Sequence, residues 1–401
     1  MRNSRPAALF LALTMLLCTL PTSAAESREW LIPKVKDSPS FADVTGTWCE
    51  SYVETVYQVG LMEGKSTTKF DAASPLTGAQ ITVITARLHS LLRGGDGVLP
   101  APGEGEAWYQ PAVNYLRSHC EDDSVREILR RFDWTTLNFA NEPCTRLCFV
   151  SMLAGVFPEP LPAINEVRIV PDSTDTRVLA FYRAGILNGS DAYGTFGESA
   201  SLTRGAAAAM LARLADPAQR LTFTLKSFDL CRDVLGIEPD TALLTVNGED
   251  IPAELFAEQL CTSLYQWEGS AKDAQKDAIL FWCYHQGSFH VMAEELGISI
   301  PAEEQEKIRL EAEENSGYLG LPAAYWQFRK EGILLNGMMN NLYVAKDWKT
   351  GSAAYHNELD KRSEAMTQNA VPAAALESMD LRAVYQRLMA SPFTVWNFQN
   401  Q

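Results

Sequence analysis

The first half of the chain repeats one order of parts three times, and this repetition restricts the fold more than any other feature. Each copy contains a helix, a loop, and a second helix that opens at a threonine, and in the two outer copies the first helix ends at a glycine. The copies occupy about residues 41–92, 106–157 and 171–214, and the middle one is the most divergent. Repeats of this kind are typical of helix-loop-helix units that bury their apolar faces against one another. The sequence therefore predicts a mainly α-helical first half.

Capping residues mark the helix boundaries in these copies. The residues placed as N-caps, ahead of the second helix in each copy, are Thr77, Thr145 and Thr203. A threonine hydroxyl there can accept a backbone N–H of the first turn. Gln80 has capping-box spacing from the first of these threonines. Gly60 and Gly185 follow the preceding helices as C-cap glycines do.

Two arginines, Arg146 and Arg204, stand at the first helical position after a capping threonine. The positive end of the helix dipole disfavours a cation there, so capping does not explain them. The same helix end offers unpaired backbone N–H groups, and a guanidinium beside them would make a converging site for a carboxylate or a phosphate. The alternative is an exposed arginine that pairs with one of the many local acids. The residue chemistry alone does not decide between the two.

The arrangement resembles the S-layer homology family. That family opens its units with Phe-x-Asp-Val and a tryptophan, punctuates them with Gly-Ile-x-x-Gly, and starts the second helix with Thr-Arg-Ala-Glu. The matching residues here are Phe41, Asp43, Val44, Trp48, Gly60, Gly64, Thr145, Arg146, Gly185, Ile186, Gly189, Thr203 and Arg204. The resemblance covers about residues 41–214. It implies a pseudo-threefold spindle with a central helical bundle and grooves between the units.

The resemblance also implies a ligand. In the family the grooves hold pyruvylated secondary cell-wall polysaccharide, a peptidoglycan-linked glycan, and the arginine of the Thr-Arg motif faces the ketal carboxylate. The residues expected to contact the polymer in this chain are Arg204, Arg146, Thr203, Thr145, Asp43, Trp48, Gly64 and Gly189. The first copy has Gly78 in place of the arginine, and Cys148 and Ala206 replace the motif's glutamate in the other copies. Two competent grooves are therefore expected.

Residues 1–25 have the parts of a secretory signal peptide. Arg2 and Arg5 form a basic start, an apolar run follows, and small residues offer cleavage after Ala24 or Ala25. The apolar run is shorter than the roughly 20 residues that span a bilayer, so a cleaved signal is favoured over an uncleaved membrane anchor. No later stretch is expected to span a membrane after cleavage. We expect an exported protein of the cell wall or cell surface, in a bacterium with a Gram-positive type of wall.

The chain is acidic, with a formal net charge of −16 at pH 7. Proteins that bind nucleic acid through phosphate contacts are usually basic, so nucleic acid is not an expected partner. Diffuse attraction to a polyanionic wall is disfavoured for the same reason. Binding to an anionic polymer must therefore come from local basic pockets.

The second half has a different pattern and predicts an irregular helical domain over residues 241–401, after a linker over 218–240. A short strand and turn are expected at Val246–Glu249, followed by a helix with Pro252 at its first position. Further helices are expected around residues 271–296, 302–315, 322–347 and 352–368.

This half resembles the N-terminal helical arm of extracytoplasmic foldases of the SurA and PrsA type. The run Val246-Asn247-Gly248-Glu249 and the later run Glu294-Glu295-Leu296-Gly297-Ile298 carry the resemblance. It implies unfolded polypeptide as a partner. No parvulin catalytic domain is expected, because no mixed α/β segment of about 100 residues is found after this region. Prolyl isomerase activity is therefore not predicted.

No catalytic residue, metal site or cofactor is predicted. Cys144 and Cys148 are four residues apart, but no nearby histidine or second cysteine pair completes a tetrahedral zinc site, so buried thiols are favoured. The run Ser66-Thr67-Thr68-Lys69 matches Ser-x-x-Lys but falls in a loop, whereas enzymes with that motif need the serine at a helix start. The sequence predicts a non-catalytic, wall-anchored surface protein. The alternative is a secreted holdase in which the repeats are structural.

Overall fold

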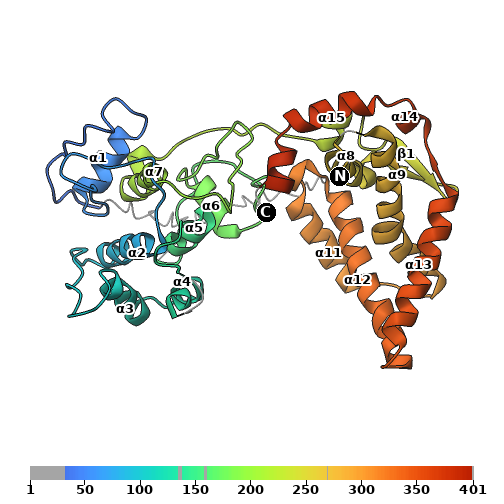
Figure 1. Cartoon of the computed structure of the whole chain (residues 1–401), viewed down its shortest axis with the longest axis horizontal. Coiled ribbons are helices and arrows are strands. Elements are labelled where there is room, and N and C mark those ends of the chain that lie inside the picture. The colour runs from blue at the N-terminus through green and yellow to red at the C-terminus, as the bar shows by residue number, and fades with distance from the viewer. Residues whose placement is uncertain (1–31, 134–137, 158–159, 269, 400–401) are drawn as a thin grey trace, which may run out of the picture.

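The structure is a computed structural model that describes residues 32–133, 138–157, 160–268 and 270–399, so the expected signal peptide lies outside the described residues. The described chain is predominantly helical, as the sequence predicts, with one small three-stranded sheet. Figure 1 shows two lobes, with α1–α7 in the first and α8–α15 in the second. Within the described residues, the structure has no helix long and apolar enough to cross a membrane.

The helices of the first lobe come from the three repeats. They are α1 (Glu50–Gln58), α2 (Gly78–Leu92), α3 (Gln110–His119), α4 (Asp123–Arg130), α5 (Arg146–Ala154), α6 (Thr176–Arg183) and α7 (Arg204–Ala215). Their apolar faces form one core, in which Val53, Leu88, Phe149 and Leu211 are fully buried. The sequence did not predict α4, which forms within the acidic segment of the middle copy and is capped by Asp122.

The predicted caps are confirmed. The hydroxyl oxygens of Thr77, Thr145 and Thr203 each accept the N–H of the third helical residue, and Thr77 forms its capping box with Gln80. Gly60 follows α1 with φ +78°. Its N–H donates to the carbonyl of Tyr57, and the next N–H donates to the carbonyl of Val56. This is the Schellman arrangement, which needs a residue that tolerates positive φ.

A closed ring of backbone hydrogen bonds joins the three repeats just before their threonine-capped helices. Leu76 N–H donates to the carbonyl of Leu202 over 2.8 Å, Leu202 N–H donates to that of Cys144 over 2.8 Å, and Cys144 N–H donates to that of Leu76 over 2.7 Å. Each copy is therefore bonded directly to both of the others. The spindle arrangement as a whole stays a prediction.

The second lobe has its own core and a small sheet. Its helices are α8 (Ala253–Gln266), α9 (Ala271–Trp282), α10 (Ser288–Glu295), α11 (Ala302–Asn315), α12 (Ala323–Lys346), α13 (Gly351–Asn369), α14 (Ala374–Glu377) and α15 (Leu381–Ala390). The single helix expected around 271–296 is divided by a wider turn at Cys283–Gly287. Residues 230–235, in the segment expected to be a linker, form a helical turn whose apolar side chains are buried in this core.

The expected strand and turn are present, as part of a β-hairpin. Strand β1 (Ala242–Val246) pairs antiparallel with β2 (Glu249–Pro252), and the turn residues Asn247 and Gly248 both have positive φ. This is the backbone that two-residue hairpin loops require. The other edge of β1 pairs with β3 (Ala370–Pro372), a strand that the sequence did not predict.

The two lobes contact each other directly. Leu319 N–H donates to the carbonyl of Pro171 over 2.9 Å, and Trp396 Nε1–H donates to Thr195 Oγ1 over 2.7 Å. Arg168, just before the third repeat, donates to the carbonyl of Glu313, near the end of α11. The second lobe is therefore attached to the third repeat.

Candidate functional site at the junctions of the repeats

Each threonine-capped helix starts against a loop of another copy. The first two N–H groups of each helix donate to carbonyls of that loop: Gly78 to Glu142 and Ala79 to Ala140, Arg146 to Ala200 and Leu147 to Glu198, Arg204 to Ser74 and Gly205 to Ala72. The third N–H is taken by the threonine hydroxyl. The prediction that unpaired N–H groups at these helix starts could meet a ligand is therefore wrong, because neighbouring repeats already use them.

Arg204 ties the third copy to the first. Its Nε–H donates to the carbonyl of Phe70 over 2.9 Å, and its Nη2 donates to that of Glu63 over 2.6 Å. The guanidinium carbon lies 4.6 Å from the centroid of the Phe70 ring, and the residue is only 6% exposed. Burial lowers its pKa, while Asp71 and Asp43 counteract that effect. Arginine stays charged at physiological pH, so these are charge-assisted bonds inside the junction.

Arg146 lies at the junction of the second and third copies, and its bonding differs from that of Arg204. Its guanidinium carbon is 5.3 Å from the centroid of the Phe196 ring. The Nε atom is buried and has no hydrogen-bond partner among the described residues. Burial lowers the pKa of Arg146, although Tyr182 and Asp172 oppose the shift. The Nε–H of Arg146 is therefore not used within the described residues, whereas the Nε–H of Arg204 donates to the carbonyl of Phe70.

The junction of the first and second copies has no arginine at the helix start. A Cβ atom on Gly78 would lie 2.3 Å from the carbonyl oxygen of Phe139 and 2.8 Å from its ring, which explains the glycine. The guanidinium carbon of Arg131 lies 5.7 Å from the centroid of this ring. All three junctions therefore pair a phenylalanine ring with a guanidinium, although the cation here comes from a different place in the sequence.

Aspartates shape the loops that carry these phenylalanines. The carboxylate of Asp43 accepts the N–H groups of Phe70 over 2.9 Å and Asp71 over 2.7 Å. Slight burial would raise its pKa, but these N–H groups lower it below the ordinary value. The sequence analysis missed Asp172, which accepts the N–H groups of Phe196 over 2.8 Å and Gly197 over 2.7 Å. A comparable Asp-to-Phe spacing in the two outer copies could have revealed it.

The remaining predicted residues lie around the same junctions. Trp48 is 66% exposed, and its Cζ2 would be 3.4 Å from a Cβ on Gly205, so the indole stands beside the start of α7. A Cβ on Gly64 would lie 2.4 Å from the Phe41 ring. In the third copy the backbone of Gly189 packs closely against that of Gly194: a Cβ on Gly189 would lie 2.4 Å from the Cα of Gly194. The two glycines thus permit close packing, and Trp48 offers an exposed surface.

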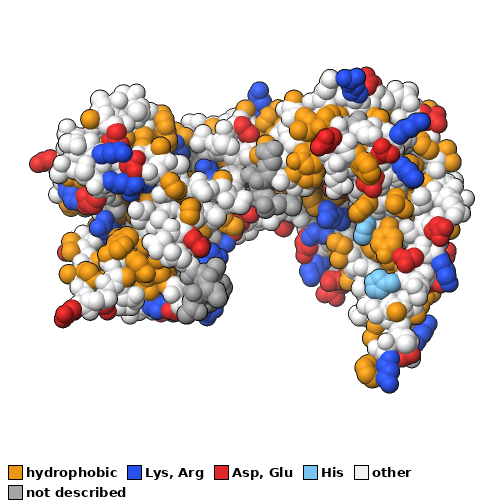
Figure 2. Space-filling view, viewed as in Figure 1, with side chains coloured by type: hydrophobic (Ala, Val, Ile, Leu, Met, Phe, Trp, Pro, Cys, Tyr) orange, Lys and Arg blue, Asp and Glu red, His pale blue; other side chains and the backbone are white. Residues whose placement is uncertain are grey.

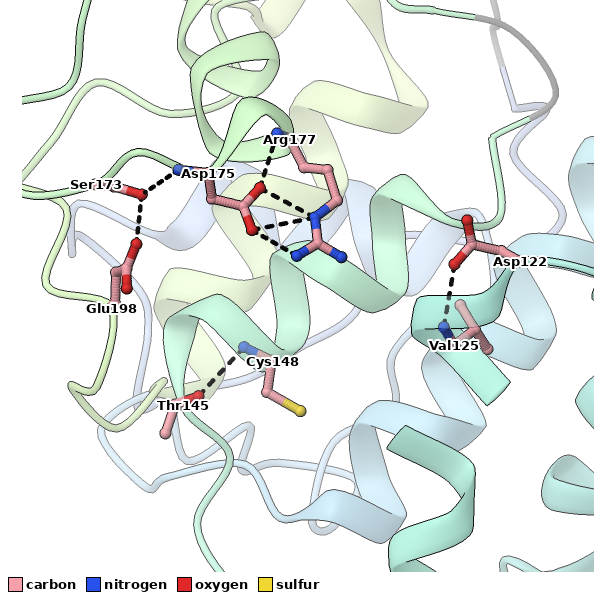
Figure 3. Close-up of polar contacts among 8 residues, drawn as sticks. All are labelled: Asp122, Val125, Thr145, Cys148, Ser173, Asp175, Arg177 and Glu198. Carbon is pink, nitrogen blue, oxygen red and sulfur yellow. Dashed lines mark hydrogen bonds and ion pairs between the residues drawn. The ribbon is translucent and has the colours of Figure 1, made fainter. Parts of the chain in front are cut away.

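The surroundings of α5 and α6 are internally bonded, as Figure 3 shows. Asp175 accepts the backbone N–H of Arg177 over 2.8 Å and also binds its guanidinium, so this arginine is already paired. Cys148 N–H donates to Thr145 Oγ1 over 3.2 Å. Cys144 and Cys148 are both buried, as expected for thiols in a core, and no cluster in the described ranges has enough histidine, cysteine or carboxylate groups to hold a metal.

Comparison with known protein families identifies a known domain in the first copy. Residues 40–82 match the family model of the S-layer homology domain. The chain carries an S-layer homology domain. Such domains are wall-binding modules, typically non-catalytic, so the domain indicates association with the cell surface through a wall polymer. Neither the curated proteins nor the solved structures contain a significant match to the chain, and the foldase resemblance of the second half stays a prediction.

Proposed function

We propose that the protein is a non-catalytic surface protein that binds a pyruvylated secondary wall polysaccharide at the junctions of its repeats, in a bacterium of Gram-positive wall type. The S-layer homology domain at residues 40–82 supports attachment to the wall. The observation that carries the binding mechanism is the guanidinium of Arg146, whose buried Nε has no hydrogen-bond partner among the described residues. A buried donor without an acceptor costs about 1–3 kcal/mol, and a ligand carboxylate would remove that cost.

Chemistry favours a carboxylate at Arg146. A guanidinium presents parallel N–H donors that match the two oxygens of a carboxylate, and a half-buried position strengthens such a bond relative to water. Thr145 keeps its hydroxyl on Cys148 N–H, so its role is to fix the helix start that carries the arginine. The ring of Phe196 would hold the guanidinium flat while the ligand approaches.

At the junction of the third and first copies the roles are divided differently. Arg204 is committed to the carbonyls of Phe70 and Glu63 and acts as a positioning residue. The exposed indole of Trp48 beside Gly205 offers an apolar face to a sugar ring. In the proposed function Asp43 and Thr203 keep the loop and the helix start in place. No broad basic patch is needed, and Figure 2 shows acidic and basic side chains intermixed over the face in view.

Co-sedimentation of the secreted protein with purified wall sacculi tests this proposal. Arg146→Ala should lower binding at least about tenfold, the change expected for roughly 1.4 kcal/mol from a lost charge-assisted bond. Arg146→Lys should restore little, because the flat pair of donors is lost. The control is Arg309→Ala, which removes an exposed cation of α11 that pairs with Glu306. Chemical removal of pyruvate from the sacculi should reduce native binding to the level of Arg146→Ala. Full binding by Arg146→Ala would refute the role of this residue.

A second function, binding of unfolded polypeptide by the second lobe, is supported by a groove between α11 and α12. The groove has a volume of about 440 Å³, and its apolar lining includes Ile308, Ile333 and Leu334. Ile333 is 60% exposed. If this groove binds clients, the full chain should suppress the aggregation of a thermally unfolded test protein, and Ile333→Asp should remove the effect. No suppression by the native chain at several-fold excess would exclude this function.

A further inference from the structure

Two segments outside the helices and strands line a groove of about 700 Å³, next to the contacts between the third repeat and the second lobe. One segment is residues 164–169, before α6. The other is residues 222–227, in the stretch that follows α7 and runs toward the second lobe (Figure 1). The volume falls within the range of roughly 300–1,000 Å³ that is typical of ligand sites. We call this site the strand-edge groove, for the reason that follows.

Both segments have the residue pattern of a β-strand. Residues 221–227 read Leu-Thr-Phe-Thr-Leu-Lys-Ser, in which apolar and polar residues alternate. Burial alternates in the same order, because Phe223 and Leu225 are half-buried against the core of the first lobe and the residues on either side of them are exposed. In the other segment, Val167 is buried between two exposed residues. A period of two residues indicates an extended chain with one face packed.

One edge of the second segment is bonded at its start and open further along. The side-chain amide of Asn165 donates to the carbonyl of Leu221 over 2.9 Å and accepts the N–H of Phe223 over 3.0 Å. The amide thereby takes the place of a peptide group in a neighbouring strand. Alternate residues of an extended chain direct their N–H and C=O groups to the same edge, so the carbonyl of Phe223 and both backbone groups of Leu225 continue this edge. These three groups have no hydrogen-bond partner among the described residues, and both residues line the groove.

The third repeat holds this edge in position without covering it. On the opposite edge, the N–H of Lys226 donates to the carbonyl of Ala192 over 2.8 Å. The side chain of Leu225 packs against Gly194, where a Cβ would lie 2.6 Å from its Cδ1. A fixed strand edge with unpaired backbone groups is a template for pairing with another extended chain.

We propose that the strand-edge groove binds an extended polypeptide strand, which pairs with the open backbone edge at Phe223 and Leu225. A peptide backbone presents donors and acceptors at the two-residue spacing of that edge, and sugars do not. Lys226 and Arg168 line the groove with Glu166, so it has one more cation than carboxylate in a chain of net charge −16. The ligand is therefore a peptide in which apolar residues alternate with polar ones, one of them acidic. This inference does not rest on wall binding, and the site is separate from the groove between α11 and α12.

Fluorescence anisotropy tests the groove, with the full secreted chain and a fluorescein-labelled peptide of sequence Val-Thr-Val-Glu-Val-Thr. Leu225→Pro removes the N–H on the open edge and should weaken binding at least about tenfold, because the peptide carbonyl opposite loses its donor. Leu225→Ala keeps that N–H and should retain most of the affinity. The matched control is Thr224→Pro, which removes an N–H of the opposite edge and should bind as the native chain does. Lys226→Glu should weaken binding of this peptide and strengthen binding of the same peptide with lysine in place of glutamate.

A peptide with every second backbone nitrogen methylated tests the pairing on an unchanged protein, and it should not bind. A tenfold loss in Leu225→Pro, with near-native affinity in Thr224→Pro, supports the groove. Equal affinity in the native chain and Leu225→Pro overturns it, as does tight binding of the methylated peptide. No saturable binding by the native chain up to roughly 1 mM peptide also overturns it. Dimerisation of the native chain that the peptide does not reverse would assign the edge to a second copy instead. Leu225→Pro should still co-sediment with wall sacculi, so failure here is distinct from failure of the proposed function.

Discussion

Arg204 and Arg146 occupy equivalent positions in two repeats, yet they should make unequal contributions to stability. Arg204→Ala removes two charge-assisted hydrogen bonds and a ring contact, and it leaves the carbonyls of Phe70 and Glu63 without their donor. A buried carbonyl that is left without its donor costs about 1–3 kcal/mol. Because the desolvation of the guanidinium is relieved at the same time, we expect a loss of about 3 kcal/mol in the free energy of unfolding.

Arg146→Ala should behave differently. It loses a ring contact worth about 1 kcal/mol, but it also removes a buried Nε–H that has no acceptor, which relieves roughly the same amount. The net change should therefore lie within about 1 kcal/mol of zero, by the same magnitudes. The asymmetry follows from the bonding alone, since both residues follow a capping threonine and both face a phenylalanine.

Thermal unfolding followed by circular dichroism measures this difference. For a unit of 150–250 residues, 1 kcal/mol shifts Tm by about 2–4 °C, so Arg204→Ala should lower the Tm of the first lobe by roughly 6–12 °C. Arg146→Ala should stay within about 4 °C of native, by the same conversion. Arg309→Ala, which removes only surface ion pairs, serves as the control for loss of charge. Equal destabilisation by the two junction variants would refute the division of roles.

Three further changes test other parts of the structure. Asp43→Asn should lower Tm at pH 7 and have less effect at pH 3. The pKa of Asp43 is lowered in the folded protein, so the ionised carboxylate stabilises the fold above its ordinary pKa, and this stabilisation is lost as the pH falls through the folded-state pKa. Thermal melts between pH 7 and pH 3 measure the difference. Gly78→Ala should lower the free energy of unfolding in urea by about 2 kcal/mol, because the new Cβ would clash with the Phe139 carbonyl. Gly105→Ala is the control: Gly105 has a positive φ but no atom near its Cβ position, so the loss should be only about 1 kcal/mol. Asn247→Ala should cost about 1 kcal/mol, since this residue has a φ of +52° and asparagine tolerates that region better than alanine.

Local chemistry explains which parts of the fold the sequence predicts. A threonine cap or a turn such as Asn247-Gly248 depends on residues within a few positions, so its signal is complete in a short window. Strand β3 was missed because three residues carry almost no periodicity, and they become a strand only by pairing with β1 more than a hundred residues earlier. The use of helix N–H groups by loops of other repeats was missed for the same reason, since each donor and acceptor comes from a different copy.

The hydrogen bonds at the junctions show that the two Thr-Arg motifs of this chain are not equivalent. A Thr-Arg pair was expected to mark a ligand site because a helix start offers free donors. The ring of repeats uses those donors to hold itself together, so only side chains remain to recognise a ligand. Of the three guanidinium groups at the junctions, Arg204 is committed to carbonyls, Arg131 enters from outside the motif, and Arg146 has a buried donor without an acceptor in the described chain. Equivalent positions in the repeats are therefore bonded differently, and the number of Thr-Arg motifs need not equal the number of arginines with a free donor among the described residues.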